Sequence, residues 1–397
     1  MPKYELLSPA GDMECIKANV KFGADAVYVG GNFMQLRAAS AAFDREKMVE
    51  AANYLHQNGK KLYVTVNSFA QNDEIEKLKD YAKELHNAGA DAAIVSDIGA
   101  ISVMKEACPE LEIHVSTQAN CMNYAAANVY YSMGAKRVVL ARELSLDEIK
   151  KIRDNIPADM ELEAFVHGAM CMSYSGRCLI SSFMTGRSAN RGLCTQPCRW
   201  KYYIYEENRP GEYFRLEEEN GKSAVLSSHD LKMIEHLDEL KNAGVCSFKI
   251  EGRMKTAYYT ATVTNAYRKA LEGETDMAYL NKELDSITHR PYSTGFYFGE
   301  LKRNCFNDGE YIQNCKFVAS VLESKNGMLK LQQRNHFAVG ECLEILSPNS
   351  KDASFVVEKI YSEKNEELSC APHPQQTVFV PCPYELSEGD ILRRRND

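Results

Sequence analysis

Four cysteines crowded into one short segment are the residues of this chain best suited to chemistry. The chain has thirteen cysteines in 397 residues, and Cys171, Cys178, Cys194 and Cys198 fall within 28 consecutive positions with the spacing C-x6-C-x15-C-x3-C. Even scatter would place only about one cysteine in a segment of that length. Four thiolates are the usual ligand set of a [4Fe–4S] cluster. The segment therefore predicts a [4Fe–4S] cluster held by these four residues.

Other uses of the four cysteines stay open at this point. Structural zinc also accepts four thiolates but favours tight C-x2–4-C pairs, and only Cys194 and Cys198 have that spacing. A free cysteine is most often a small buried apolar residue, so inert packing competes with metal binding for each one. Disulfides are disfavoured in a reducing compartment. The glycines at 176 and 192, which allow close backbone approach, favour the cluster.

Polar side chains at predicted strand ends and in the cysteine segment are the other candidates. Carboxyl ends of parallel strands meet at one face of an α/β fold, where active sites occur. Each such residue can instead cap a helix or satisfy loop backbone, and a histidine beside the loop can be purely structural. The candidates are Asn67, Arg142, Arg187 and Arg253 for substrate binding, and His167 and Glu251 for catalysis.

A repeated unit organises the first two thirds of the chain. Four segments, 22–31, 88–97, 133–142 and 243–252, each place a glycine before a short apolar run. The glycine suits the residue after a helix, where a positive φ is needed, and the run is typical of a strand buried on both faces. Eight such strands are expected, at 4–9, 25–31, 61–67, 91–97, 112–117, 137–142, 161–168 and 247–252.

Helical signals separate these strands. Ser145 and Glu148 have the spacing of a capping box. An apolar stripe with helical spacing is formed by Ile75, Leu78, Ala82 and Leu85. Strands alternating with helices predict an α/β fold, a TIM-like (β/α)8 barrel, with an open doubly wound sheet as the competing form. The sequence has no G-x-G-x-x-G at Gly30-Gly31, which argues against dinucleotide binding.

The remaining chain predicts three further parts. The barrel is expected over 1–275, with an insert at 170–229 that holds the cysteine loop and a small antiparallel β-meander. A connector is expected at 276–309. Short alternating apolar runs over 310–397 predict a small C-terminal β-barrel domain.

Composition limits the class of protein. A net charge of −8 disfavours a chain that coats nucleic acid, although a local basic site is compatible with it. There is no run of 18 uncharged apolar residues, so no membrane span is expected. The first residues become charged at once and lack an apolar signal region, which predicts a cytoplasmic protein.

Several long motifs resemble the peptidase U32 family. They are ELLSPAGDMEC at 5–15, VVLARELSL at 138–146, ELEAFVHGAMCMSYSGRCLIS at 161–181, RGLCTQPCRW at 191–200, and the run from SSHDLKMIEHL to SFKIEGRMKTAYYTATVTNAYRKAL. The family name records a collagenase-like protease assignment. The resemblance implies oxygen-independent hydroxylation proteins with a [4Fe–4S] cluster, whose cysteines map onto Cys171, Cys178, Cys194 and Cys198. Branches of the family act on wobble uridine of tRNA, a ribosomal RNA cytidine, or ubiquinone precursors.

The β-rich tail makes the chain most similar to the tRNA branch, which forms 5-hydroxyuridine with prephenate as hydroxyl donor. The expected partners are then the tRNA anticodon arm, contacted by Tyr202, Tyr203 and Tyr205 or by the β-domain, and a small dicarboxylate cosubstrate. Two alternatives stay open: a U32-type peptidase and a non-catalytic iron–sulfur partner of another hydroxylase. The sequence has no H-E-x-x-H or G-x-S-x-G motif, which argues against two familiar hydrolase classes.

Overall fold

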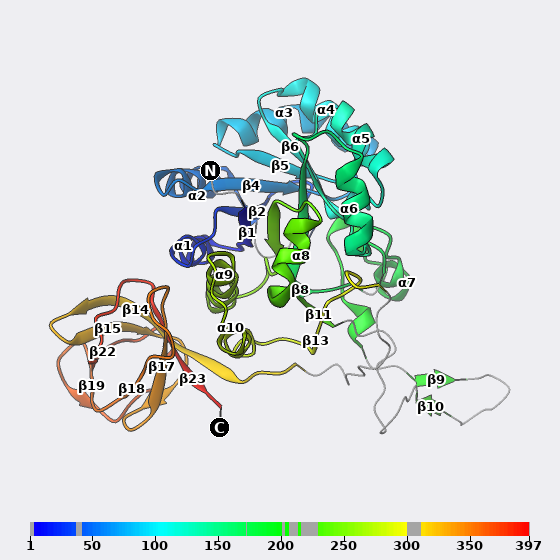
Figure 1. The fold of residues 1–397 in the computed structure, drawn as a ribbon. Helices are drawn as coiled ribbons and strands as arrows, with labels where there is room; N and C mark the ends of the chain where they lie inside the picture. The colour runs from blue at the N-terminus through cyan, green and yellow to red at the C-terminus, as the bar shows by residue number, and fades with distance from the viewer. Residues whose placement is uncertain are drawn as a thin grey trace. The chain divides into compact units, whose positions relative to one another are not determined.

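A closed parallel barrel forms the larger part of the protein (Figure 1). The computed structural model describes residues 4–36, 42–171, 173–200, 203–205, 213–215, 229–299 and 311–396. Neighbouring strands pair in parallel, and β12 pairs with both β1 and β8, which closes the ring. The barrel strands are β1 Glu5–Pro9, β2 Ala26–Gly31, β4 Lys61–Val66, β5 Ala92–Val95, β6 Glu112–Val115, β7 Arg137–Val139, β8 Glu161–Ala169 and β12 Ser247–Ile250. All eight predicted strands are confirmed, and closure rules out the open sheet.

A helix follows each barrel strand along the chain. They are α1 Met13–Lys21, α2 Arg45–Gln57, α3 Asn72–Asn87, α4 Ile98–Ala107, α5 Tyr124–Ser132, α6 Leu146–Asp154, α8 Leu237–Asn242 and α9 Ala257–Leu271. The glycine expected after a helix has a positive φ in all four repeats, at 97° for Gly23, 88° for Gly89, 89° for Gly134 and 98° for Gly244. Because a side chain is strained at such φ values, these glycines fix where each helix turns back into a strand.

The predicted helix signals are confirmed in part. Ser145 Oγ accepts the backbone N–H of Glu148 at 3.3 Å, as a capping residue should. In a full capping box the Glu148 carboxylate would accept the Ser145 backbone N–H. Here that carboxylate accepts from Lys151 Nζ at 2.6 Å instead. In α3 the expected stripe faces inward: Leu78, Ala82 and Leu85 are buried and Ile75 is half-buried.

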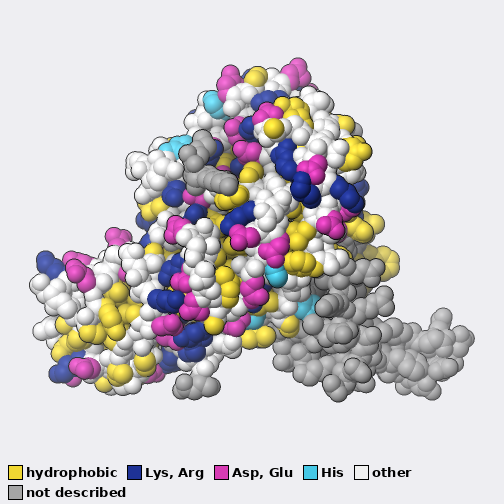
Figure 2. All heavy atoms as spheres, in the orientation of Figure 1, with side chains coloured by type: hydrophobic (Ala, Val, Ile, Leu, Met, Phe, Trp, Pro, Cys, Tyr) yellow, Lys and Arg dark blue, Asp and Glu magenta, His cyan; other side chains and the backbone are white. Residues whose placement is uncertain are grey.

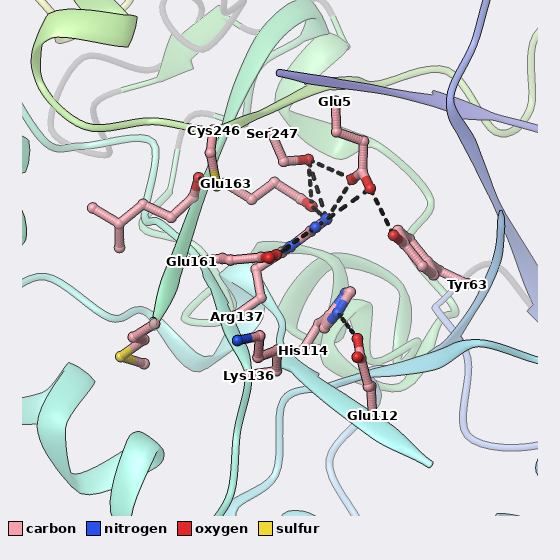
Figure 3. Close-up of polar contacts among 12 residues, drawn as sticks. Glu5, Tyr63, Glu112, His114, Lys136, Arg137, Glu161, Glu163, Cys246 and Ser247 are labelled. Atoms are coloured by element: carbon pink, nitrogen blue, oxygen red, sulfur yellow. Dashed lines mark hydrogen bonds and ion pairs between the residues drawn. The ribbon is translucent and has the colours of Figure 1, made fainter. Parts of the chain in front are cut away.

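The end of the barrel interior where the strands begin is filled by charge (Figure 3). Arg137 is 4% exposed and pairs with three carboxylates, Glu5, Glu161 and Glu163. Burial opposes ionisation of Glu163, but the nearby Lys249 ammonium and Arg137 guanidinium outweigh it and lower the pKa of Glu163 to about 2. The network joins strands β1, β7, β8 and β12, and the Tyr63 hydroxyl adds β4 by donating to Glu5 Oε2 at 2.7 Å. Side-chain contacts therefore cross-link five strands at this end of the barrel.

The insert after β8 contains short elements that no periodicity could reveal. They are α7 Ile180–Thr185, and 3₁₀ turns η2 Ala189–Arg191 and η3 Pro197–Arg199. Two antiparallel strands of the predicted meander are present, β9 Tyr203–Tyr205 and β10 Tyr213–Arg215. The third predicted meander strand, at 222–228, and Tyr202 lie outside the described residues.

Five other short elements of the barrel unit were not predicted. β11 Asp230–Lys232 runs antiparallel to β8, and β13 Tyr292–Ser293 pairs with β11. A buried ion pair from Arg290 to Asp230, with Nη2 and Oδ1 2.7 Å apart, holds this addition. The others are β3 Ala42–Phe43 beside β2, η1 Thr117–Ala119 after β6 and η4 Ile234–His236 before α8.

A second compact unit contains the C-terminal sheet, α9 and α10 Met277–Leu284. Within this unit Arg393 is buried and donates from Nη1 to Glu283 Oε2 at 3.1 Å. The eight strands pair in the order β18-β17-β23-β14-β15-β22-β19-β20. Their bounds, with the separate pair β16 and β21, are β14 Cys315–Lys325, β15 Met328–Gln333, β16 Phe337–Ala338, β17 Cys342–Leu346, β18 Ser354–Val356, β19 Ile360–Tyr361, β20 Glu367–Leu368, β21 Cys370–Ala371, β22 Thr377–Pro381 and β23 Ile391–Arg395.

The sheet of the second unit curls into an antiparallel half-barrel around an apolar core. The β-rich tail predicted from the sequence is therefore confirmed. The predicted domain boundaries, 1–275, 276–309 and 310–397, stay a prediction. No helix in the described part of the chain is long and apolar enough to cross a membrane.

Candidate active site

A pocket opens where the barrel strands end. It has about 730 Å³ of space between atoms, part of it open to solvent. Side chains at the ends of several strands converge there because the barrel is parallel and closed. The polar and aromatic residues that line it include Tyr28, Thr65, Asn67, Gln118, Arg142, Phe165, Lys249, Glu251 and Arg253, and Cys171 from the cysteine loop also lines it.

Two predicted arginines line this pocket. Arg142 donates from Nη1 to the Ala169 carbonyl at 2.8 Å, and its guanidinium lies 4.7 Å from the centre of the Phe165 ring. It forms no ion pair with any residue that the structure describes. Arg253 is buried and donates from Nη1 to Thr65 Oγ1 at 2.6 Å. Both guanidinium groups are thus held in place at a site that can receive an anion.

The third cation of the pocket is Lys249, which was not predicted. Its Nζ lies 2.8 Å from Glu163 Oε1 and 4.5 Å from the centre of the Tyr28 ring. The Tyr28 hydroxyl donates to the Ile250 carbonyl at 2.9 Å and lies 3.4 Å from Glu251 Oε2. The alternation of a strand places positions 247, 249 and 251 on one face, and this signal could have identified Lys249.

Asn67 also lies at the pocket, and its Oδ1 accepts the Leu36 N–H at 3.2 Å. Arg187 does not join the other predicted arginines, because it is exposed between α7 and η2 and does not line the pocket. The expected trio of Arg142, Arg187 and Arg253 is therefore not assembled. Lys249 takes the place that the sequence had suggested for Arg187.

His167 is placed behind the pocket wall. It is buried, its ring centre is 5.5 Å from that of Tyr292, and it is not among the residues that line the pocket. Burial, with the positive charges of His289 and Lys232, lowers the pKa of His167 to about 3. Its backbone carbonyl accepts the N–H of Glu251 at 2.8 Å. His167 thus helps to place Glu251, and its ring is a weak base.

The cysteine loop is attached to the barrel beside the pocket. The Ser175 N–H donates to Glu143 Oε1 at 2.9 Å. Gly176 has a φ of 72°, and a side chain there would bring Cβ within 2.2 Å of the Gln118 carbonyl oxygen. Only glycine allows this close approach of the loop backbone to the barrel. Glu143 Oε2 is buried, and it has no hydrogen-bond partner within the described residues.

A second attachment ties the loop to the turn after β4. Arg191 donates from Nη1 and Nη2 to the two oxygens of Glu74, at 3.1 and 2.9 Å, and from Nη1 to the Phe69 carbonyl at 2.9 Å. The bidentate pair lowers the pKa of Glu74. Asn190 Nδ2 in turn donates to the Cys178 carbonyl at 3.2 Å. The loop therefore crosses from the end of β8 to the end of β4.

The four cysteines lie on this loop but are not gathered. Cys171 and Cys194 are exposed, Cys178 and Cys198 are half-buried, and none forms a disulfide. The Gln196 N–H donates to Cys194 Sγ at 3.4 Å, a contact that suits a thiolate. No group of three or more His, Cys, Asp or Glu side chains within the described residues is placed to hold a metal ion. The donor chemistry of four cysteines fits an iron–sulfur cluster, although the described loop does not bring the thiols together.

The two halves of the loop are already joined to each other. The Thr195 N–H donates to Ser181 Oγ at 3.1 Å, and the hydroxyls of Thr185 and Thr195 lie 3.2 Å apart. Because Ser181 follows Cys178 closely and Thr195 follows Cys194, these bonds hold the two cysteine-bearing segments side by side.

The fold and site together define a TIM-like barrel protein with a cationic pocket beside a cysteine-rich loop. Residues 11–306 match Peptidase family U32, and residues 313–393 match the Peptidase family U32 C-terminal domain. The chain belongs to the peptidase U32 family, which confirms the resemblance seen in its motifs.

Three relatives illustrate how far the similarity extends. The chain is 36% identical to tRNA hydroxylation protein P1 of Bacillus subtilis, over 99% of this chain and 95% of the relative. It is also 36% identical to tRNA hydroxylation protein P of Escherichia coli, over 100% and 97%. An uncharacterized protease of Methanocaldococcus jannaschii is 42% identical, over 77% of this chain and 75% of the relative.

Proposed function

We propose that this chain hydroxylates tRNA, converting the wobble uridine to 5-hydroxyuridine with prephenate as hydroxyl donor. The observation that carries the proposal is the pocket in which Arg142, Lys249 and Arg253 converge beside Cys171. Support also comes from the two full-length relatives named tRNA hydroxylation proteins. Family and fold alone would leave the substrate open, because one fold hosts many activities.

A dicarboxylate suits the basic side of the pocket. Arg142, which forms no ion pair within the described residues, can bind one carboxylate through two parallel hydrogen bonds. Arg253 and Lys249 add positive charge around the second carboxylate. Lys249 keeps its Glu163 partner at 2.8 Å, so it supplies a fixed and partly neutralised charge.

A uridine can reach this pocket only after leaving its stack, as enzymes that act on bases require. Hydroxylation would form a C–O bond at C5 while the C–O bond of the hydroxyl donor breaks, and the donor would keep that electron pair and so be reduced by two electrons. The C5 hydrogen would leave as a proton, so a proton acceptor is needed nearby. We assign this role to the carboxylate of Glu251, which the Tyr28 hydroxyl and the His167 carbonyl help to position.

The four loop cysteines are the proposed ligands of a [4Fe–4S] cluster. They supply the complete donor set of such a cluster, and Cys171 lies at the pocket wall. When bound, the cluster would supply one-electron redox chemistry. The arginine side chains of the loop would balance its negative charge, as Arg191 already does for Glu74.

A cysteine peptidase, the main alternative, needs a thiolate paired with an imidazole base. His167, the histidine next to the loop, has its ring against Tyr292 and a pKa lowered to about 3. Such a ring is a poor base for Cys171. The pocket instead surrounds Cys171 with cations and Glu251, which favours an anionic ligand over a peptide.

The test is hydroxylation by purified, anaerobically reconstituted protein. Iron content is measured first, and about four irons per chain are expected for one cluster. Hypomodified tRNA is then incubated with prephenate, and its nucleosides are analysed by mass spectrometry. We expect 5-hydroxyuridine from the native chain. The variant Arg142→Ala should need roughly tenfold more prephenate, since it loses a charge-assisted contact.

The matched control is Lys151→Ala, which removes an exposed charge on α6. Absence of 5-hydroxyuridine from iron-loaded native protein would reject the hydroxylase, and digestion of denatured collagen that survives iron removal would favour the peptidase. Activity that appears only when a second protein is added would instead indicate a non-catalytic partner.

A further inference from the structure

The cysteine loop presents a surface rich in exposed apolar side chains. Phe183 on α7 is 89% exposed and Leu179 is 71% exposed. Met184, Leu193 and Trp200 are also exposed, and we call these five residues the α7 surface. Apolar side chains are visible at the surface in Figure 2 where Figure 1 places α7. Large exposed apolar patches on soluble proteins mark sites of interaction.

All charged side chains within the cysteine segment itself are basic. Arg177 and Arg187 are exposed, and neither forms an ion pair with another residue that the structure describes. The segment 170–200 contains no aspartate or glutamate, although the chain has 55 acidic residues in 397. About four would be expected at average composition. This net-negative protein thus has one segment that combines exposed apolar side chains with arginines and lacks acidic residues, which suits an anionic partner.

The attachments of the loop place this surface beside the pocket. Gly176, just before α7, meets the carbonyl of Gln118, a residue that lines the pocket. Asn190, just after α7, meets the turn of Phe69 that follows the pocket residue Asn67, with the Phe69 N–H 3.4 Å from the Asn190 carbonyl. Since both ends of the helical segment are fixed at the pocket edge, α7 lies at that edge as well.

We propose that the α7 surface binds the single-stranded loop of an RNA whose target base enters the adjacent pocket. A neighbouring unstacked base lies on Phe183 or Trp200, and Arg177 and Arg187 bind phosphates on either side. Aromatic stacking accepts any base, and the arginines add a contribution that depends on salt. This inference rests on the proposed function, because an RNA substrate is what brings such a loop to the pocket.

A second copy of the chain is the other occupant to consider. In a twofold contact the same surface meets itself, so Arg177 and Arg187 of both copies would approach one another without acidic partners in this segment. Like charges placed together disfavour that arrangement. RNA has the opposite charge and also satisfies the apolar side chains by stacking.

The experiment measures binding of a fluorescein-labelled anticodon stem-loop RNA to the iron-loaded full-length chain by anisotropy. We expect Phe183→Ala to raise Kd by about 5-fold to 100-fold, the usual range for a lost base stack. Phe183→Trp should retain the affinity of the native chain. Arg187→Gln should reduce the slope of log K against log salt by close to one unit. Val129→Ala, which trims an exposed apolar residue on α5, is the matched control.

Hydroxylation assays on the same proteins separate the two proposals. If native protein hydroxylates tRNA but Phe183→Ala leaves both Kd and KM for RNA unchanged, the α7 surface is rejected and the proposed function stands. If native protein binds RNA through Phe183 but forms no 5-hydroxyuridine, the function is rejected and the surface stands. A change in oligomeric state with Phe183→Ala, without any change in RNA binding, would assign the surface to a second copy and overturn the inference.

Discussion

The two ends of the barrel use arginine in opposite ways. At the end where the strands begin, Arg137 pairs with Glu5, Glu161 and Glu163 (Figure 3). Carboxylates of the protein therefore neutralise its charge. At the mouth, Arg142 contacts a carbonyl and an aromatic ring. The first arrangement stabilises the fold and leaves nothing for a ligand. The second fixes the side chain while its charge stays available.

Lys249 connects these two ends. Its Nζ contacts Glu163 of the charged network at the end where the strands begin. The same residue also lines the pocket at the end where the strands finish. Burial of two opposite charges costs desolvation energy, which is recovered only when the geometry is good. A buried pair at this position is therefore best explained by two roles, one in the network and one in the pocket.

The largest effect on stability is expected from Arg137→Leu, in the charged network at the end where the barrel strands begin. Removing the guanidinium leaves buried carboxylates without their main partner, which should lower the free energy of unfolding by about 3–5 kcal/mol. Chemical denaturation at neutral pH measures it. The control Lys151→Leu removes an exposed partner of Glu148 and should have a far smaller effect. Equal effects of the two variants would mean that the buried network does not stabilise the barrel.

The next largest effect is expected from a substitution at the pocket, which should change activity without changing the fold. Cys171→Ser removes one of the proposed cluster ligands at an exposed position, so we expect loss of iron and at least a roughly 100-fold loss of hydroxylation, while the melting temperature without iron stays the same. Cys342→Ser, at an exposed cysteine of the second unit, is the control. Full iron content in Cys171→Ser would remove that residue from the ligand set.

Local signals explain why so much of the fold could be predicted. A strand buried on both faces and a glycine with positive φ are each encoded within a few residues, and all eight strands and four glycines were found in this way. The gathering of Asn67, Arg142, Glu251 and Arg253 then follows from barrel geometry, since strand ends share one face. Elements of two or three residues, such as β11 and β13, carry no periodicity and were missed.

The contacts that fix the site are long-range and could not be predicted. Arg191 and Glu74 are 117 positions apart, and Arg137 and Glu5 are 132 apart, so only the closed barrel brings them together. Arg187 has the same chemistry as Arg142, but nothing local indicates that it turns away from the pocket. The convergence of the four thiols also depends on loop conformation, which a spacing pattern does not determine.

A moderate effect on stability, measurable only at acidic pH, is expected from the buried His167 ring. The charged network keeps its groups charged, whereas burial keeps the His167 ring neutral, with a pKa lowered to about 3 from an ordinary value of 6.5. In the unfolded chain the His167 ring binds a proton below about pH 6.5, whereas in the folded chain it binds one only below about pH 3. Stability contributed by the neutral ring is thus complete above pH 6.5 and declines as the pH falls, by ~2 kcal/mol at pH 5.

The variant His167→Gln should remove this part of the decline. Urea denaturation at pH 7 and pH 5 measures it, and the difference between the two pH values should be smaller in the variant by that amount. His114, which is also buried with a lowered pKa, adds its own decline to both proteins and cancels in the comparison. An unchanged difference would show that the His167 ring is protonated in the folded state.

The smallest effect on stability is expected where the loop meets the barrel. Glu74→Gln replaces a charged acceptor of Arg191 by a neutral one, and because the Arg191 side chain is 34% exposed, solvent screening limits the loss to no more than ~1 kcal/mol. The loop, however, should be held less firmly beside the pocket. We expect a several-fold loss of hydroxylation and slower iron incorporation, measured by absorbance during reconstitution. Glu76→Gln, which removes an exposed partner of Lys79 on the same helix, is the control. If Glu74→Gln and Glu76→Gln incorporate iron at the same rate, the Arg191 attachment does not prepare the cysteine loop for its cluster, and the mouth would be organised by the Glu143 and Gln118 contacts alone.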